Sequence, residues 1–369
     1  MITPVALRRQ LHRHPELSFQ EQESAARIAE ALTEAGIPFT PIAQTGILAR
    51  IEGRGDLKRA VMLRADIDAL PIREESGVEF ASEVEGVMHA CGHDMHAGIL
   101  FGVLCALRKG EFEGTLFGLF QPAEEVNPGG ALRVLEENPL ADYDVVAVVG
   151  EHVEPELEVG EIGLRAGDYM AANDELHIHL RGHGGHAALR SKIQDTVGAA
   201  ARLTLALLSL NREEVILSIG KVEAPGATNV IPDRVELQGT LRCFDPQMRL
   251  EVLSEIKRVA QEEQSLSGIE TEVEIREGYP PVVNHPQLTQ EARALASTVG
   301  YRVVELERRP TSEDFGRYGE RYPSLFYRLG VGRLSGRTHT AHFNPDEAAM
   351  EVGIDFMTRL ALKLFDKQD

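Results

Sequence analysis

The chain contains a group of residues whose types suit a metal ion. Residues 91–96 read Cys-Gly-His-Asp-Met-His, and further candidates follow downstream: the pair Glu124-Glu125, then His152 and His339. Thiolate, imidazole and carboxylate groups are the ligands that first-row ions such as zinc, manganese and cobalt prefer. A purely structural role is the alternative for the Cys-Gly-His turn, but such groups rarely gather without a metal. These residue types therefore predict a metal centre.

The candidates follow segments that read as buried strands. Apolar runs at 60–65, 115–120 and 144–149 are typical of a parallel sheet that is covered on both faces. Asp66 and Asp68 follow the first run, the acid pair follows the second, and a histidine follows the third. Open α/β sheets bind ligands at the carboxyl ends of their strands. We therefore expect the candidates to converge on one site.

The number of candidates indicates more than one ion. A closed structural zinc site uses four ligands, whereas this chain offers Cys91, His93, Glu125, His152 and His339. Mixed donors in excess of four argue for two ions that share a bridging ligand or a water molecule. Two ions about 3.5–4 Å apart can polarise a carbonyl group and supply hydroxide near neutral pH. The set is thus suited to hydrolysis.

Glu124 is predicted to be the general acid/base. Hydrolysis of an amide requires a group that moves a proton from water to the leaving amine. Neighbouring side chains at a strand end point in different directions, so Glu125 can bind metal while Glu124 faces the substrate. A solvated acidic turn is the alternative, and the position of the pair directly after a buried strand argues against it.

Composition limits the class of protein. The 369 residues, 43% of them hydrophobic, suffice for two domains with a sizeable core. A formal charge of −20 argues against nucleic acid or an anionic membrane as a partner. Three cysteines are too few for a disulfide framework, and neither a signal peptide nor a membrane span is evident. We therefore expect a protein of the reducing cytoplasm.

The pattern of elements predicts an insertion. An α/β alternation is interrupted by a β-α-β-β-α-β order, which is that of a ferredoxin-like unit. Its expected elements are strand 175–180, helix 195–210, strands 214–222 and 234–243, helix 247–264 and strand 271–277. We therefore expect a discontinuous α/β domain at 1–170 and 283–369 that carries the candidate ligands, and an inserted α+β domain at 171–282.

Several longer motifs stand in the chain in a distinctive order. They are Leu11-His12-x-x-Pro15-Glu16-Leu17, Arg64-Ala65-Asp66-Ile67-Asp68-Ala69-Leu70-Pro71, Met88-His89-Ala90-Cys91-Gly92-His93-Asp94, Gln121-Pro122-Ala123-Glu124-Glu125, Gly184-Gly185-His186-Ala187-Ala188, Asn229-Val230-Ile231-Pro232, Gly239-Thr240-Leu241-Arg242 and Ser312-Glu313-Asp314-Phe315. With them the chain resembles, over nearly its whole length, the metal-dependent amidohydrolases that include hippurate hydrolases, N-acyl-amino-acid amidohydrolases, auxin-conjugate hydrolases and N-acetyl-diaminopimelate deacetylases.

The resemblance implies a fold and roles for the catalytic residues. The implied fold is a dinuclear-metallopeptidase-like α/β domain, mainly parallel, with an inserted ferredoxin-like lid. Asp68 matches an aspartate that orients the metal centre, and Glu124 matches the general acid/base. Asp66 stands where many relatives have a ligating histidine, so we expect it beside the ligands and not among them. The implied ligands of two divalent ions (zinc, manganese or cobalt) are Cys91, His93, Glu125, His152 and His339.

The resemblance also assigns residues of the insert. His186, Asn229 and Arg242 match positions that contact the substrate in relatives. The edge strands of the inserted sheet could pair with a second chain, and dimeric relatives point the same way, so we expect a homodimer through the insert.

The expected activity is cleavage of the amide of an N-acyl amino acid into a carboxylic acid and a free amino acid. A dipeptidase or carboxypeptidase that uses the same site is an alternative, as is a catalytically silent metal-binding dimer module. Glu151 and Glu154 depart from the family pattern, because relatives usually carry an apolar residue and an aromatic there. If either faces the pocket, we expect it to favour a substrate with a distal cation.

Overall fold

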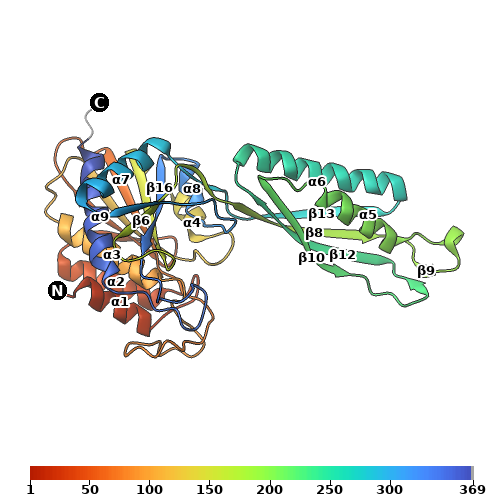
Figure 1. The fold of residues 1–369 in the computed structure, drawn as a ribbon, viewed down its shortest axis with the longest axis horizontal. Coiled ribbons are helices and arrows are strands. Elements are labelled where there is room, and N and C mark those ends of the chain that lie inside the picture. The colour runs from red at the N-terminus through yellow and green to blue at the C-terminus, as the bar shows by residue number, and fades with distance from the viewer. Residues whose placement is uncertain (367–369) are drawn as a thin grey trace. The chain divides into compact units, whose positions relative to one another are not determined.

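The computed structural model describes residues 1–366, which form two compact units (Figure 1). Unit 1 contains Met1–Gly167, Val283–Glu307 and the chain from Asp314 onward. Unit 2 contains Asp168–Val282 and Arg308–Glu313. The second segment of unit 2 differs from the expected boundaries, which left it in the catalytic domain.

Unit 1 is built on a mixed sheet of eight strands in the order β1-β2-β4-β3-β5-β16-β6-β15. The central strands β4, β3, β5 and β16 run parallel to their neighbours in that series. The strands are β1 Phe39–Ile42, β2 Gly46–Glu52, β3 Arg59–Asp66, β4 Thr115–Gln121, β5 Asp144–Glu154, β6 Glu161–Leu164, β15 Arg302–Glu305 and β16 Ser324–Gly330. The parallel centre of the sheet confirms the fold class that the sequence predicts.

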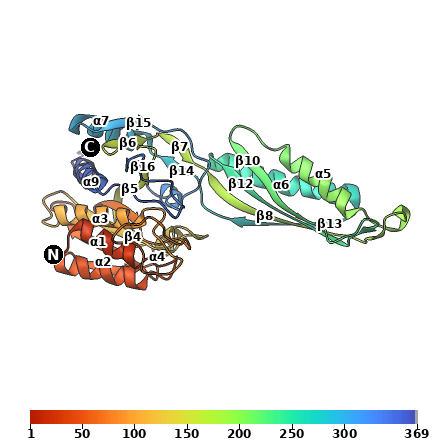
Figure 2. The same ribbon diagram turned by 60° about the horizontal axis from the view of Figure 1, so that its bottom comes forward.

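Helices that are far apart in sequence pack together on this sheet. The first three helices lie side by side in both ribbon views (Figures 1 and 2), and five helices share one hydrophobic core with the strands. Those five are α1 Pro4–Arg13, α2 Gln22–Ala35, α3 His93–Leu107, α7 Pro286–Val299 and α9 Ala349–Phe365. Two short helices, α4 Gly130–Glu137 and α8 Gly316–Gly319, contact each other.

Strand β5 is longer than the sequence predicts. It continues five residues beyond the expected end at 149, so His152 lies inside the strand and not after it. Val149 and Val153 point into the core shared with the helices. Because side chains alternate along a strand, Glu151 faces that core and His152 faces the other side of the sheet.

Unit 2 has the predicted β-α-β-β-α-β order. Its antiparallel sheet has the strand order β10-β12-β8-β13, in which the first and last strands along the chain occupy adjacent positions. The elements are β8 Ala172–Arg181, α5 Thr196–Leu208, β10 Val215–Glu223, β12 Arg234–Cys243, α6 Pro246–Ser267 and β13 Glu270–Glu277. The smaller elements of unit 2 are β9 Gly185–His186, the 3₁₀ turn Arg190–Lys192 and β11 Val230–Ile231, and the short strands β7 Gly167–Met170 and β14 Val282–Asn284 span its boundaries with unit 1.

Helices α5 and α6 pack on one face of the antiparallel sheet. Their buried residues and those of the strands form a hydrophobic core that is separate from the core of unit 1. Within residues 1–366, none of the helices has the length and apolar character needed to cross a membrane.

Candidate metal centre

The structure brings the five predicted ligands of unit 1 together. The sulfur of Cys91 lies 3.3 Å from Nε2 of His152 and 3.3 Å from Nε2 of His339. Oε1 of Glu125 lies 3.3 Å from Nε2 of His339 and 4.0 Å from Nε2 of His93. Side chains from segments up to 248 positions apart therefore point at a common centre.

The ligand atoms form two overlapping sets. One set contains Cys91, His93 and His152, and the other contains Cys91, Glu125 and His339; in each, the donor atoms lie within 4.8 Å of one another. Cys91 belongs to both sets, so the two sets share one side chain. This arrangement matches the expectation of two ions that share a ligand.

Two buried atoms of the cluster have no hydrogen-bond partner among the described residues. They are Nε2 of His93 and Oε1 of Glu125. A buried polar atom without a partner costs free energy, so such atoms usually indicate a bound group or a functional role. Burial and the charge of Glu125 also raise the pKa of Cys91 to about 12, and a nearby cation would be needed to hold a thiolate there. These residues fit divalent metal ions.

Hydrogen bonds orient the imidazole rings of the cluster. Nδ1 of His93 donates to the backbone carbonyl of Asp68 at 2.9 Å, with the Asp68 carboxylate at 3.2 Å. Nδ1 of His152 donates to the carbonyl oxygen of Val153 at 2.7 Å. Since the Nδ1 proton is used in this way, Nε2 of each ring is the nitrogen that remains available to a metal ion.

Asp68 connects two candidate ligands. Besides its contact with His93, it accepts hydrogen bonds from the Ser18 hydroxyl at 2.7 Å and from the backbone N–H of Glu125 at 2.9 Å. Burial alone would raise the pKa of Asp68, but the hydrogen bond and charge of His93 outweigh it and lower the pKa. The carboxylate therefore stays ionised and fixes the positions of His93 and Glu125.

Glu124 is buried beside the ligands. A carboxylate oxygen of Glu124 lies within 4.8 Å of donor atoms of both His93 and Glu125, and the residue is 8% exposed. The preceding residue, Ala123, has a φ of 54°, and its N–H donates to Oε1 of Glu21 at 2.8 Å. The turn after β4 thus brings both acids of the pair to the cluster.

Comparison with known proteins identifies the family. The model of peptidase family M20/M25/M40 matches residues 62–363. The chain belongs to this family. It is 38% identical to an N-acetylcysteine deacetylase of Bacillus subtilis (strain 168), with 97% of this chain and 96% of the relative covered.

Further relatives agree. The chain is 36% identical to an N-acetyldiaminopimelate deacetylase of Bacillus cytotoxicus, with 96% of each covered. A crystal structure from Bacillus subtilis described as a dinuclear metal binding peptidase from the M20 family has a TM-score of 0.88 and 36% identity, with 99% of this chain and 98% of that chain covered. The family resemblance that the motifs predict is confirmed.

In this member of the M20 family, the three predicted substrate residues of unit 2 are not all together. His186 is paired with Val230 in the two-stranded β9–β11 sheet, next to Asn229, whose carbonyl accepts from Ala187 at 2.9 Å. Arg242 lies near the opposite end of β12, where Nη1 donates to the Ser312 hydroxyl at 2.9 Å. The structure therefore joins His186 with Asn229 and separates both from Arg242.

The structure shows the surroundings of three residues that the sequence left open, Glu151, Glu154 and His342. Glu151 is 1% exposed and accepts a hydrogen bond from the Tyr327 hydroxyl at 2.8 Å, and burial raises its pKa to about 8. It faces the helix-side core, so Glu151 does not meet the condition on which its cation-selecting role depended. Glu154 is buried as well and accepts from the N–H of Glu156 at 3.3 Å. His342 is a second histidine close to His339 in the sequence, but it is largely exposed and its Nδ1 donates to the carbonyl of Glu75. His339, in contrast, lies beside Cys91 and Glu125.

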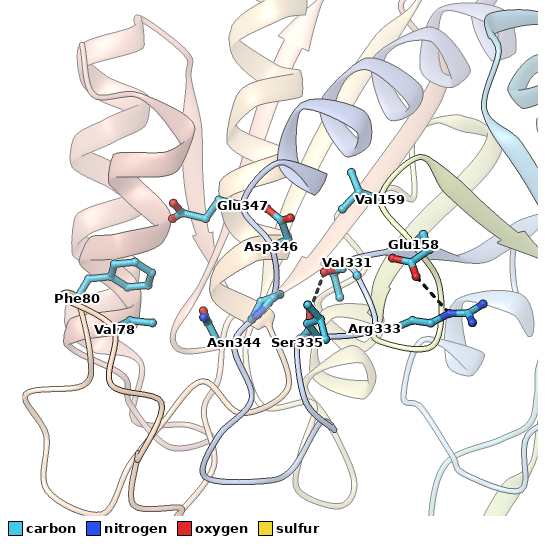
Figure 3. A pocket seen from close by; sticks show the side chains of 13 residues that line it. Val78, Phe80, Glu158, Val159, Val331, Arg333, Ser335, Asn344, Asp346 and Glu347 are labelled. Atoms are coloured by element: carbon cyan, nitrogen blue, oxygen red, sulfur yellow. Dashed lines mark hydrogen bonds and ion pairs between the residues drawn. The ribbon is translucent and has the colours of Figure 1, made fainter.

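A cavity of about 650 Å³ borders the segment that carries His339 (Figure 3). In this view Phe80 and Val78 lie on its left, and Glu347 and Asp346 lie above Asn344. Its described lining includes none of the five candidate ligands. This cavity is therefore distinct from the metal centre.

Proposed function

We propose that this protein is a metal-dependent hydrolase that cleaves the amide bond of N-acyl amino acids into a carboxylic acid and a free amino acid. The observation that carries the proposal is the pair of ligand sets that share Cys91, with Glu124 beside them. The relatives named as deacetylases of N-acetylcysteine and N-acetyldiaminopimelate support this substrate class.

Two divalent ions fit the donor atoms. Cys91, His93 and His152 would hold one, and Cys91, Glu125 and His339 would hold the other. Ions bound there would polarise the amide carbonyl and lower the pKa of a water molecule. Zinc, cobalt and manganese differ in their preference for thiolate and imidazole donors. Reloading the metal-free protein with each ion would show which one supports activity.

Glu124 would move the proton that the reaction requires. A carboxylate at this position can accept a proton from the attacking water and give it to the departing amide nitrogen, which leaves as a neutral amine. Its burial limits competition from bulk water. Asp68 does not reach the reacting atoms in this scheme; it acts by holding His93 and the backbone of Glu125.

Residues of unit 2 would recognise the substrate. Arg242 can bind the α-carboxylate of an N-acyl amino acid through two parallel hydrogen bonds, and His186 can stabilise the carbonyl oxygen. Between Arg234, at the β9–β11 end of the sheet, and Arg242, strand β12 advances eight residues, or about 26 Å at the usual rise per residue.

That span exceeds the length of a small N-acyl amino acid. If His186 and Arg242 contact one substrate molecule, they therefore come from different chains. This geometry supports the proposal of a homodimer through unit 2.

All three cysteines are free, which fits a reducing compartment such as the cytoplasm.

A substrate panel tests the function. The full chain is freed of metal with a chelator, reloaded with zinc, manganese or cobalt, and assayed on N-acetylcysteine, N-acetyldiaminopimelate, N-benzoylglycine and simple dipeptides. We expect hydrolysis of N-acyl amino acids only in the reloaded protein. Cleavage of dipeptides alone would replace this proposal with a dipeptidase, and inactivity towards every substrate would favour a silent metal-binding module.

A further inference from the structure

His96 lies among the candidate ligands and has no role in the proposed chemistry. It is fully buried, with its ring centroid 4.8 Å from that of His152 and 5.5 Å from that of His93. Donor atoms of Asp66, His93 and His96 lie within 4.8 Å of one another, which is close enough for a further metal set. Proximity alone would therefore make Asp66 and His96 ligands.

The hydrogen bonds of His96 argue against that role. The backbone N–H of Val153 donates to Nε2 at 3.0 Å, and Nδ1 lies 2.6 Å from Oδ1 of Asp66. An N–H can only donate, so Nε2 is the acceptor and the ring proton resides on Nδ1, from which it is given to Asp66. Both ring nitrogens are thus in use, whereas Nε2 of His93 has no hydrogen-bond partner among the described residues.

Asp66 is likewise occupied. Its second oxygen accepts from Nη1 of Arg64 at 2.6 Å. Arg64 in turn donates to Oδ1 of Asp314 at 2.8 Å and to Gln121 at 3.0 Å. The side chains of Asp66, Arg64, Asp314 and Gln121 are all completely buried. A continuous chain of bonds therefore runs from the interior through Asp66 and His96 to the backbone of residue 153.

This chain of hydrogen bonds lies where strands β3 and β5 are no longer paired with each other. The pairing of β3 with β5 ends at the register Arg64 with Gly150, although β5 continues to Glu154. His96, in the first turn of α3, connects the last residue of β3 with Val153 of β5 beyond that point. The carbonyl of the same Val153 accepts the Nδ1 proton of His152. His96 therefore holds the backbone residue that orients His152.

We propose that His96 is a positioning residue, which fixes His152 for the ion that Cys91, His93 and His152 would hold and does not itself bind metal. The inference rests on the proposed metal centre. Loss of the acceptor at Nε2 leaves the Val153 N–H without its partner on the β3 side of the strand, while β5 stays paired with β16 on its other side. Outer partners of metal ligands typically change metal affinity by about 10- to 100-fold when they are replaced.

A matched pair of substitutions separates the two bonds of His96. Gln carries an amide oxygen near the position of Nε2 and can still accept from Val153. Asn carries its amide nearer the position of Nδ1 and can bond Asp66 but not Val153. We expect His96→Gln to keep both ions at near wild-type affinity, and His96→Asn to bind one of the two about 10- to 100-fold more weakly.

The measurement is binding of cobalt to the metal-free full chain. Calorimetry gives the affinities, metal analysis gives the number of ions bound, and absorption bands report the cobalt–thiolate unit. His342→Asn serves as the control, because His342 is an exposed histidine of the same region. Its affinities should equal those of the wild type. Circular dichroism and the melting temperature show whether each variant folds.

The outcomes are distinct. Unchanged affinities in folded His96→Asn would overturn the positioning role. Equal loss of one ion in His96→Gln and His96→Asn would also overturn it, because that result indicates a direct ligand. A wild-type chain that binds no cobalt would remove the proposed metal centre as well, whereas a wild type that binds two ions leaves the variants as the test of His96 alone.

Discussion

Two residues at the candidate centre hold a backbone conformation that side chains with a Cβ rarely adopt. Ala123 has a φ of 54° and His339 a φ of 61°. Such a conformation costs about 1–2 kcal/mol per residue and persists only where surrounding contacts enforce it. Glu21 holds the N–H of Ala123, and the carbonyl of Ala90 holds the N–H of His339 at 2.7 Å. The backbone thus aims the acid pair and the last ligand at the cluster.

The two acids of the pair should respond differently to the same substitution. Glu124→Gln keeps the shape of the side chain and removes the proton carrier, so we expect kcat to fall by about two to four orders of magnitude with metal content unchanged. Glu125→Gln should lose metal, because a neutral amide is a poor ligand for these ions. Activity assays with metal analysis on both variants check this, and an exchange of the two phenotypes would reverse the assignment.

Residue types were enough to predict the cluster but not the division of labour inside it. Cys91 and its partners stood out because thiolate, imidazole and carboxylate groups followed predicted strands. The role of His96 could not be predicted, because a histidine three positions after His93 is of the same residue type as a ligand. Only its hydrogen bonds with Asp66 and Val153 separate the two roles. Glu151 could not be placed because the true end of β5 was not visible in the sequence.

Helix α1 is tied to the start of α3 by buried charges. The guanidinium of Arg8 contacts Asp94 at 3.0 Å and Glu347 at 2.7 Å. His12 lies between two carboxylates, with Nδ1 2.9 Å from Asp94 and Nε2 3.1 Å from Glu74. Asp94 follows His93 directly, so these contacts anchor the first turn of the helix that carries a candidate ligand.

This network predicts a pH dependence of stability. Burial lowers the pKa of His12, but the attraction of Asp94 and Glu74 outweighs burial and raises the pKa from 6.5 to about 9. A group with a raised folded-state pKa stabilises fully below its unfolded value, and the contribution disappears as the pH rises through the folded value. We therefore expect His12 to contribute up to about 3 kcal/mol below pH 6.5 and little above pH 9.

The comparison of wild type with His12→Gln by denaturant unfolding of the metal-free chain measures this contribution. The difference in free energy of unfolding should shrink steadily between pH 6.5 and pH 9.5. His342→Gln provides the control for a histidine on the surface. A difference that stays constant over this range would show that His12 is not charged in the folded protein.

At the level of elements, long periodic segments were predictable and some short ones were not. The expected strand at 234–243 coincides with β12, and the expected strand at 115–120 differs from β4 by one residue. The four-residue strand β6 and the eight-residue helix α4 were missed, because neither is long enough to show a repeating apolar pattern. Such elements form because their neighbours in the fold offer them a surface or an edge.

At the scale of the molecule, the proposed homodimer would need a surface on unit 2 that can pair with a second copy of the chain. Strand β10 is an edge of the antiparallel sheet, so part of its backbone has no neighbouring strand within the described sheet. Leu205 of α5 and Val222 of β10 line one small apolar hollow beside that edge and are 71% and 60% exposed. Exposed apolar side chains next to a free edge are typical of a surface that pairs with another subunit.

A complementation experiment decides whether two chains build one site. Glu124→Gln removes the proton carrier beside the metal centre of its own chain, and His186→Ala removes a group of unit 2, so each variant alone should have low activity. If His186 acts on the centre of the partner, a mixed dimer has one complete site. Random reassembly of equal amounts should then restore about a quarter of wild-type activity.

The double variant Glu124→Gln/His186→Ala gives the matching control. Mixed in equal amounts with wild type and reassembled, it should lower the activity to about a quarter of that of undiluted wild type, because every mixed dimer lacks a complete site. If His186 acts within its own chain, the same mixture keeps about half, and the two single variants restore nothing. Light scattering on the mixtures verifies that dimers form, and a monomer at assay concentration would contradict the proposal directly.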